Sequence, residues 1–400
     1  MASVDSAVMI PDRLYTKPFV LAFAANFFSG LAFALFLHLP GYLSDLGADE
    51  TQIGVIFGLT AVASIAMRPF LGTAMDRYGR RPVILLGNII NITFILFYLT
   101  VSVLGPWVYV VRIGHGVAEA MLFSALFTYG TDVVPSSRRT EGLAMFGVSG
   151  LLPIAFAGII GDIVLVVAGF RELFMLAAFF AFLTLAFSLP LPERKPAQQP
   201  GVVRRGFWAI ARNRELLPIW WMIGMFSFAL TAYFVFLRTY VDETGVGSVG
   251  LFFAVYAAVA IIERIFFGRV PQRFGEHRTL YVALIVFAAG FVVLATTSST
   301  VGVALAGAMC GAGHGYAFPI LTSMTVTRAP DADRGSAIAF FTSLFDVGLL
   351  VGGPILGAII GARGYPAMFL FAGFAVFAGV LIFAVWDRSV MRPRAGVTSG

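Results

Sequence analysis

The chain has 400 residues, of which 59% are hydrophobic and only 12% are charged, and its formal net charge is +6. Soluble domains carry charge on roughly a quarter of their residues, so this composition excludes an ordinary water-soluble fold. Stretches such as VILLGNIINITFILFYLTVSV are continuously apolar over the length that a membrane-crossing helix needs, which also excludes the alternating strands of a β-barrel. The sequence therefore predicts an all-α polytopic membrane protein.

Twelve apolar segments follow one another along the chain. The expected helices cover residues 18–39, 51–71, 83–104, 107–130, 142–165, 172–190, 216–239, 249–268, 279–298, 300–325, 336–360 and 366–386. The polar segment LPERKPAQQPGVVRRGFWAIARNREL separates six helices from six. We therefore expect an N-terminal bundle at 1–190, a cytoplasmic linker at 191–215 and a C-terminal bundle with a short tail at 216–400. Within the linker, RRGFWAIARNREL is either an interfacial amphipathic helix or a solvated tether.

Most of the lysines and arginines fall in the termini, the linker and alternate loops. The loops SDLGADE and VDETGVGS contain none. The positive-inside rule then predicts that both termini are cytoplasmic, in a protein of the cell inner membrane. Basic residues scattered in this way do not indicate a nucleic-acid partner, and no phosphate-binding G-x-x-x-x-G-K-[ST] loop indicates a nucleotide. With a single cysteine, Cys310, and no metal-ligand spacing, we expect no disulfide framework, metal or cofactor.

An internal repeat relates the two halves. A shift of 196 residues places RPFLGTAMDRYGRR on RIFFGRVPQRFGEH, so that Arg68 pairs with Arg264 and Arg77 with Arg273. Duplicated six-helix halves are a known transporter plan in which the substrate site lies between the halves at mid-depth. The repeat therefore predicts a central site in a membrane transporter.

Residues 72–81, with the pattern G-x-x-x-D-R-x-G-R-R, resemble the signature loop of the major facilitator superfamily. RIGHGVAEA resembles the fourth-helix motif of its proton-coupled members, and GLLVGGPILG resembles the glycine–proline pattern of its gating helices. GVSGLLPIAFAGIIG matches the antiporter motif only in part, because Leu152 stands where a glycine is expected. The resemblance, nearest to the twelve-helix bacterial efflux permeases, implies a monomeric secondary transporter and not an enzyme. Its partners would be a small-molecule substrate, protons and the lipid bilayer.

Ionisable residues inside the membrane are costly and are therefore candidates for function. On the fourth helix Arg112, His115 and Glu119 are spaced to share one face, and Asp346 lies halfway along the eleventh. Burial disfavours a charged carboxylate whereas a nearby arginine favours it, so a small movement can change its protonation. We expect Glu119 or Asp346 to carry the proton, with Arg112 and His115 assisting. The alternative is that these groups only neutralise one another and hold the bundle together.

Two further sets of residues are assigned. The substrate cavity is expected to be lined by Asn26, Arg112, Glu119, Tyr233, Arg238, His314 and Tyr316. The cytoplasmic gate is expected to contain Arg68, Gly72, Asp76, Arg77, Gly79, Arg80, Arg81, Arg264, Gly268 and Arg273.

The stretch from Gly72 to Pro82 is expected to form a tight turn with glycine-dependent geometry. Resemblance to the family places Asp76 near the N-terminus of the eleventh helix, at 335–337, where it would latch the two halves. Arg238 either faces the cavity mouth or extends to the outer interface. Asp162, at the outer end of the fifth helix, is expected to be solvated.

Three functions are compatible with these features. The first is proton-coupled export of a drug or metabolite by alternating access of the two halves. The second is import of a small organic anion, with Arg112 and Arg238 binding its charge. The third, a non-transporting sensor or a membrane enzyme, lacks any visible soluble domain, nucleophile or cofactor motif. The substrate depends on the shape of the cavity, because one fold serves many cargoes.

Overall fold

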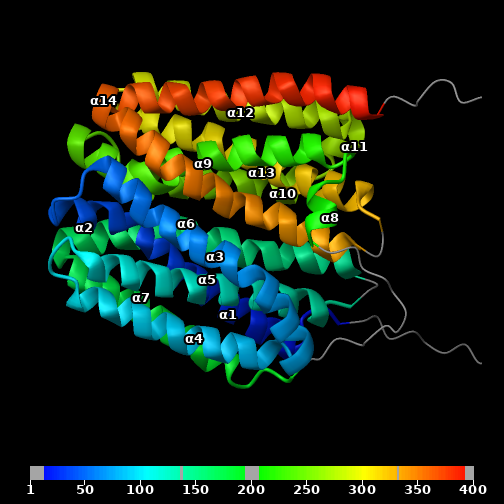
Figure 1. Cartoon of the computed structure of the whole chain (residues 1–400), viewed down its shortest axis with the longest axis horizontal. Coiled ribbons are helices and arrows are strands. Elements are labelled where there is room, and N and C mark those ends of the chain that lie inside the picture. The colour runs from blue at the N-terminus through cyan, green and yellow to red at the C-terminus, as the bar shows by residue number, and fades with distance from the viewer. Residues whose placement is uncertain (1–12, 136–137, 194–206, 331–332, 392–400) are drawn as a thin grey trace, which may run out of the picture.

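The computed structural model describes residues 13–135, 138–193, 207–330 and 333–391, and every regular element in these ranges is helical (Figure 1). Within helices, the following side chains are not described: Pro69, Thr73, Asp76, Arg139, Thr140, Glu141, Leu143, Ala144 and Phe207. The first half contains α1 (Lys17–Ala34), η1 (Leu35–His38), α2 (Leu39–Asp45), α3 (Glu50–Tyr78), α4 (Arg80–Phe97), η2 (Tyr98–Thr100), α5 (Pro106–Val133), α6 (Arg139–Val167) and α7 (Phe170–Ser188). The second half contains α8 (Phe207–Ala211), α9 (Leu217–Thr244), α10 (Val249–Phe266), α11 (Val270–Phe274), α12 (Glu276–Thr296), α13 (Thr300–Arg328) and α14 (Arg334–Met391).

The prediction of twelve spans agrees with these elements. Within the described residues 11 helices are long and apolar enough to cross a membrane, and one of them, α14, is a double span. At Gly364 the backbone turns to a φ of 80°, which L-residues avoid, and α14 folds back there as two antiparallel segments (Figure 1). The chain therefore has the predicted all-α architecture.

The junction between the second and third spans is more helical than expected. Helix α3 begins at a capping box formed by Asp49 and Gln52 and continues to Tyr78, seven residues beyond the predicted end. Only Gly79, with a φ of 98°, interrupts the helix before α4 begins at Arg80. The predicted turn at 72–82 is therefore wrong for its first half. Gly72 lies inside α3 facing open space, so close backbone approach at Gly72 is wrong as well.

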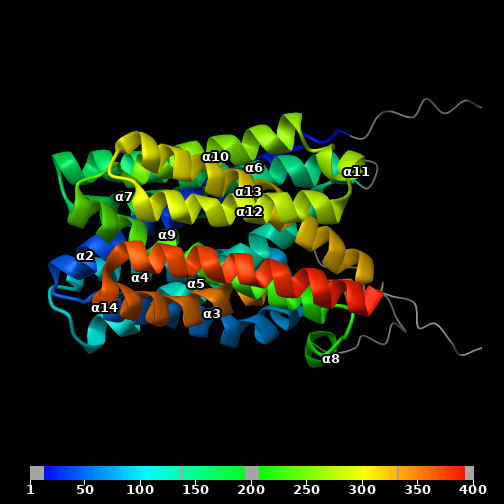
Figure 2. The same ribbon diagram turned by 90° about the horizontal axis from the view of Figure 1, so that it is seen from above.

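Two helix pairs join the halves. Helix α3 packs along the first segment of α14, and α6 packs along α10, as Figure 2 shows. Both pairs bring backbones together at glycines: a Cβ on Gly54 would lie 2.1 Å from the carbonyl oxygen of Gly353, and one on Gly158 would lie 3.1 Å from the Cα of Gly250. Such small-residue contacts are how membrane helices approach closely.

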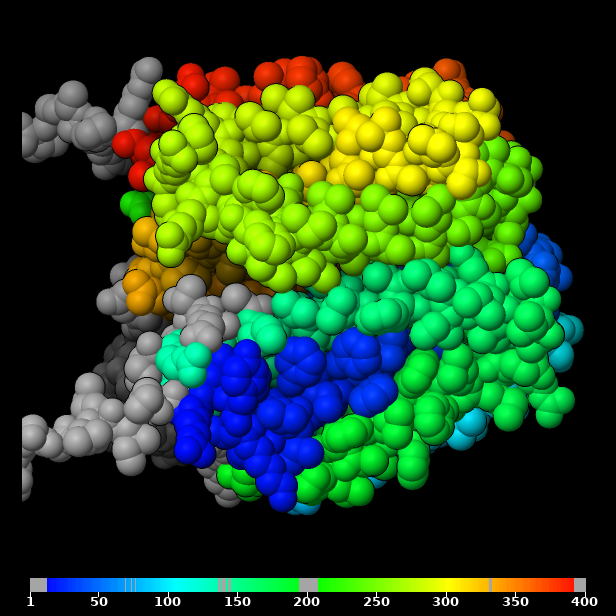
Figure 3. Space-filling view, turned by 180° about the vertical axis from the view of Figure 1, so that it is seen from behind, coloured from blue at the N-terminus to red at the C-terminus, as the bar shows by residue number. Residues whose placement is uncertain are grey.

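The two ends of the bundle differ. We call the end at which α1 begins and α14 finishes the terminal end, and the opposite end, which contains α2, the far end (Figure 1). At the far end η1 and α2 pack against α9 and close the space between the halves. Extensive packing of α5 on α13 is absent among the described residues, and the surface is hollowed between the halves towards the terminal end (Figure 3). This hollow is called the cleft below.

Candidate functional site

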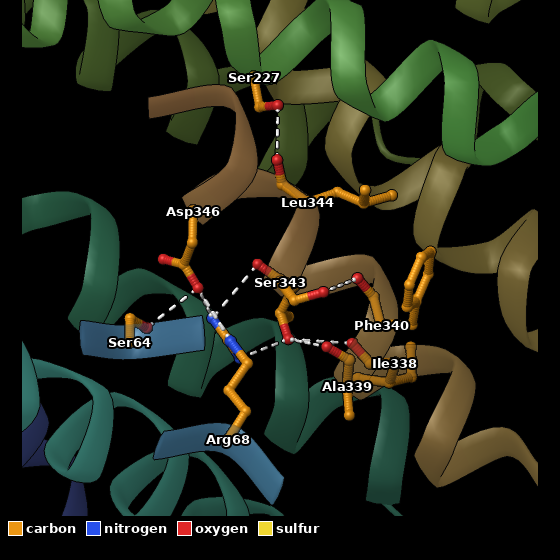
Figure 4. A network of polar contacts seen from close by, with 10 residues as sticks. Ser64, Arg68, Ser227, Ile338, Ala339, Phe340, Ser343, Leu344 and Asp346 are labelled. Carbon is orange, nitrogen blue, oxygen red and sulfur yellow. Dashed lines mark hydrogen bonds and ion pairs between the residues drawn. The ribbon is translucent and has the colours of Figure 1, made fainter. Parts of the chain in front are cut away.

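An ion pair at mid-length joins the two halves. Arg68 on α3 donates from Nε and Nη2 to Oδ2 of Asp346 on α14, at 2.9 and 2.6 Å (Figure 4). The hydroxyl of Ser64 donates to the same oxygen at 3.0 Å, and Arg68 also donates from Nη1 to the hydroxyl of Thr342 at 2.8 Å. The side chains of Arg68 and Asp346 are only 12% and 20% exposed. Short charge-assisted bonds of this kind fix the relative position of both helices.

The predicted cluster on the fourth span, α5, exists in the structure. Glu119 Oε1 lies 3.3 Å from His115 Nε2, one helical turn away, and the guanidinium of Arg112 lies 4.4 Å from the centroid of the Phe57 ring. Arg112 and His115 are 2% and 1% exposed, and the Glu119 side chain is 15% exposed. Nε and Nη1 of Arg112 have no hydrogen-bond partner among the described residues. Such unsatisfied buried charge is expensive, which favours a functional role over a purely structural one.

The two candidate carboxylates lie close enough to influence each other. Glu119 interacts electrostatically with Arg112 and with Asp346. Since Asp346 belongs to the second half and Glu119 to the first, a change of charge on one carboxylate alters the field at the other across the interface between halves. The two carboxylates therefore interact across the interface between the halves.

The second half contains an arginine at the position that repeats Arg68. Arg264 on α10 faces α6, where a Cβ on Gly147 would lie 3.6 Å from its Nη1 atom. Its neighbour Glu263 is directed at α13, because a Cβ on Gly315 would lie 2.2 Å from Glu263 Oε2. Nε of Arg264 and Oε2 of Glu263 are enclosed without a hydrogen-bond partner in the described part of the chain.

Several residues assigned to the cavity lie elsewhere. Tyr233 is 1% exposed and packs among the aromatic rings of Phe252, Phe291 and Tyr256, so it belongs to the core of the second half. The Tyr316 hydroxyl donates to the carbonyl of Phe267 at 3.1 Å. Placing Tyr233 on the cavity is therefore wrong, whereas the assignment of Tyr316 stays a prediction.

A separate cavity of about 380 Å³ explains the position of Tyr316. This cavity lies within the second half, between α10, α12 and α13, and Tyr316 and Glu263 both line it. His314, in contrast, lies on α13 next to Phe226 and shares a hydrogen bond with Tyr256. Asn26 donates to the hydroxyl of Ser149 at 2.8 Å, which ties α1 to α6 within the first half.

The far end contains contacts that the sequence did not reveal. Arg238 forms an ion pair with Asp242 at 2.8 Å, next to Gly41 of α2, so its charge is already neutralised. Asp162, expected to be solvated, accepts a hydrogen bond from the backbone N–H of Gly250 at 2.6 Å and lies 3.8 Å from His38 Nδ1. The expectation of a solvated Asp162 is wrong, because α10 of the other half covers it.

The remaining gate residues lie at the terminal end, but two of them hold the first half together. Arg80 donates to Asp132 at 3.1 Å and to the Met75 carbonyl at 2.9 Å, and Arg81 donates to the Leu189 carbonyl at 2.7 Å. These bonds connect segments of the first half, and the assignment of both arginines to the cytoplasmic gate stays a prediction. Three other residues are exposed there, on or beside the last turn of α3 and in the α10–α11 segment: Arg77, Gly268 and Arg273. The Asp76 side chain lies outside the described residues.

Chemically, the central region offers carboxylates, guanidinium groups and imidazoles in a largely apolar setting. No group of three His, Cys, Asp or Glu side chains that could hold a metal ion occurs within the described ranges. The arrangement suits proton exchange and charge recognition between two halves that can move. The fold and this site together define a polytopic membrane transporter.

The family follows from direct comparison. The Major Facilitator Superfamily profile matches residues 19–353 and 247–399, so the chain belongs to that family of transporters. The Staphylopine export protein of Staphylococcus aureus is 24% identical over 93% of this chain and 96% of its own length. An uncharacterised MFS-type transporter of Pseudomonas aeruginosa is 26% identical over 89% of each chain.

Solved structures agree on the fold. The human organic anion transporter MFSD10 superposes with a TM-score of 0.71 and 18% identity, covering 92% of this chain and 99% of its own. A POT family transporter superposes with a TM-score of 0.77 and 15% identity, covering 94% and 96% of the two chains. Identities this low establish the shared architecture and leave the cargo open.

Proposed function

We propose that the protein exports a small organic molecule in exchange for protons, with Glu119 as the group that carries the proton. One observation carries this proposal. Glu119 is a largely buried carboxyl group in a membrane helix, close to His115 and electrostatically linked to Arg112 and to Asp346 of the other half. Protonation of Glu119 would change the field around the Arg68–Asp346 ion pair, which joins the halves. No nucleotide is needed, because the proton gradient supplies the energy.

The direction of the cleft supports alternating access. We propose that the terminal end is the cytoplasmic end, as the positive-inside rule predicts, and that the membrane is the cell inner membrane. The cleft would then open to the cytoplasm, ready to take up cargo for export. The closed far end, held by the packing of α2 on α9 and by the Asp162–Gly250 hydrogen bond, would be the periplasmic gate. Rocking of the halves would close the terminal end and open the far end.

The export direction draws support from a relative, since the first of the similar proteins is named an exporter of staphylopine. The alternative, import of an organic anion bound by Arg112 and Arg238, is weaker because Arg238 already has Asp242 as its partner. Arg112 remains available for either direction.

The role of Glu119 can be tested in proteoliposomes containing the pH-sensitive dye pyranine. Staphylopine and ethidium serve as two probe cargoes, each added with and without an imposed pH gradient. We expect Glu119→Gln to abolish gradient-driven flux and the accompanying proton movement. Downhill exchange of the same cargo between the two sides should persist, because the glutamine keeps the shape of the site.

The matched control is Glu172→Gln, which removes an exposed carboxylate in the first turn of α7. It should transport like the unmodified protein. Gradient-driven flux that survives Glu119→Gln at the control rate would contradict the assignment of Glu119. If no variant transports staphylopine or ethidium, the proposal that the protein exports these cargoes is contradicted.

A further inference from the structure

The two helix pairs that join the halves are related by the internal repeat, but they differ in charge. Arg68 on α3 corresponds to Arg264 on α10, and α14 corresponds to α6. Both partner helices contain an internal proline, Pro354 in α14 and Pro153 in α6. The acid that neutralises Arg68, Asp346, lies eight residues before Pro354. Neither Gly150, which the shift of 196 residues places on Asp346, nor Met145, eight residues before Pro153, is an acid, so the repeat lacks the second acid.

Without that acid, Arg264 faces a gap. The helix opposite presents Gly147, which has no side chain to place beside Arg264: a Cβ there would lie 3.6 Å from the Nη1 atom. Arg264 makes no hydrogen bond and no ion pair within 4.0 Å to any described residue, and its Nε is fully enclosed. Glu263, the nearest carboxylate, interacts electrostatically with Arg264 but is directed away towards Gly315 on α13. A guanidinium held in this way is short of an anionic partner.

The surroundings suit a ligand rather than a missing protein contact. Arg264 is partly exposed, and it lies two residues before the end of α10, on the side of that helix that meets α6. His314 and Tyr256 lie within electrostatic range of Arg264, but they are hydrogen-bonded to each other and do not supply an anion. Guanidinium groups recognise carboxylates through a planar pair of donors.

We propose that Arg264 binds the carboxylate of the transported molecule, which supplies the charge that Asp346 supplies to Arg68. The cargo class is therefore a small organic acid. This inference rests on the proposed transport function for its meaning, but binding itself requires neither a gradient nor flux. It makes Arg264 a specificity-determining residue and gives the two interfaces distinct tasks. The α3–α14 interface holds the halves together, and the α6–α10 interface recognises cargo.

Equilibrium binding to the purified full chain in detergent tests the proposal, with benzoate as the probe. Benzoate raises the thermal unfolding midpoint in a concentration-dependent way if it binds the folded state. Benzamide, which has the same shape without the charge, and benzylammonium, which has the opposite charge, should give no such shift. Phenyl phosphate distinguishes a carboxylate site from a general anion site.

Four variants locate the binding. We expect Arg264→Gln to weaken the apparent benzoate affinity by about 10-fold to 100-fold, the usual range for a lost charged hydrogen bond. Arg264→Lys should retain part of the affinity because the positive charge remains. Gly147→Asp should abolish the benzoate shift, since it places a carboxylate of the protein beside Arg264. Arg269→Gln, which removes an exposed arginine just after α10, is the matched control and should respond to benzoate like the unmodified protein.

Several results would overturn the proposal. These are the absence of any benzoate shift, an equal shift with benzamide, and a benzoate affinity unchanged by Arg264→Gln and Gly147→Asp. Phenyl phosphate binding more tightly than benzoate would overturn the carboxylate class. Because Arg264→Lys and Gly147→Asp retain or add charge, they keep the test decisive if Arg264→Gln fails to fold. A failed proton-coupling test at Glu119 would leave benzoate binding intact, so the two proposals fail separately.

Discussion

The interface of α3 with α14 and the interface of α6 with α10 are two copies of one design that have diverged. Both bring glycines of opposite halves into backbone contact, Gly54 with Gly353 and Gly158 with Gly250. The first places its polar bond at mid-length, where Asp346 neutralises Arg68. The second places its polar bond at the far end, where Asp162 accepts from the Gly250 backbone, and it leaves Arg264 without an ion pair among the described residues.

The difference shows how two copies of one repeat can supply a stabilising contact in one place and a binding site in the other. Breaking a paired charge leaves an uncompensated partner in a poorly solvated place, so the α3–α14 pair resists separation. An unpaired guanidinium costs stability in the empty protein, and that cost can be recovered when a ligand binds. Stability and specificity are thus distributed between the two interfaces.

The largest expected effect comes from neutralising each arginine in turn. Arg68→Met should lower the free energy of unfolding by about 3 kcal/mol, because it leaves Asp346 largely buried without its partner. Arg264→Met should not destabilise the ligand-free protein, since it removes a charge that has no partner among the described residues. Thermal unfolding of both variants in the same detergent gives the comparison.

A double variant is the control for this pair. Arg68→Met combined with Asp346→Leu should recover much of the lost stability, because neither charge is then left unpaired. Equal losses for Arg68→Met and Arg264→Met would show that the two arginines have equivalent environments, and the contrast between the interfaces would fail.

The second expected effect concerns the far end of the α6–α10 interface. Asp162→Ala removes the charged acceptor of the Gly250 N–H hydrogen bond. It should destabilise the closed state of the far end, relative to the open state, by about 2 kcal/mol. A shift of that size changes the ratio of closed to open states more than tenfold. Electron-spin distance measurements between labels at Ser44 and Glu243, which are both exposed, would report the opening.

Two features make the label experiment interpretable. The only native cysteine, Cys310, is buried and should not react with the label. Asp45→Ala removes an exposed carboxylate at the end of α2 and serves as the control. Distances in Asp162→Ala that match those in Asp45→Ala would mean that the Asp162–Gly250 bond does not hold the far end closed.

Much of this comparison was accessible from the sequence. The repeat that pairs Arg68 with Arg264, the intramembrane acid Asp346 and the shared face of α5 are all one-dimensional patterns, because helical spacing and hydropathy fix them. The partner of Asp346 was not accessible, since Arg68 lies 278 residues away and pairing depends on which faces meet.

Other features depend on three-dimensional context for similar reasons. Asp162 at a helix end has the sequence pattern of a solvated acid, and only the approach of Gly250 changes that. The placement of Tyr233 in the aromatic core depends on how α9 is rotated about its axis. A helix that is apolar on all sides does not reveal this rotation in its sequence. The helical continuation of α3 to Tyr78 shows that charged residues near a membrane surface can extend a span instead of ending it.

The smallest expected effect would make the two interfaces alike. Gly147→Asp places a carboxylate on α6 opposite Arg264, at a position where a Cβ makes only an ordinary van der Waals contact with Nη1. The new pair is partly solvated, so we expect a gain of about 1 kcal/mol or less in the free energy of unfolding. Loss of glycine from the helix interior adds a similar amount, for which Gly147→Asn is the control. If Gly147→Asp is no more stable than Gly147→Asn, then Arg264 does not lack a partner at this position. If it is more stable and transport is lost, the second interface has been converted into a copy of the first, because the carboxylate on α6 then occupies the place left for cargo.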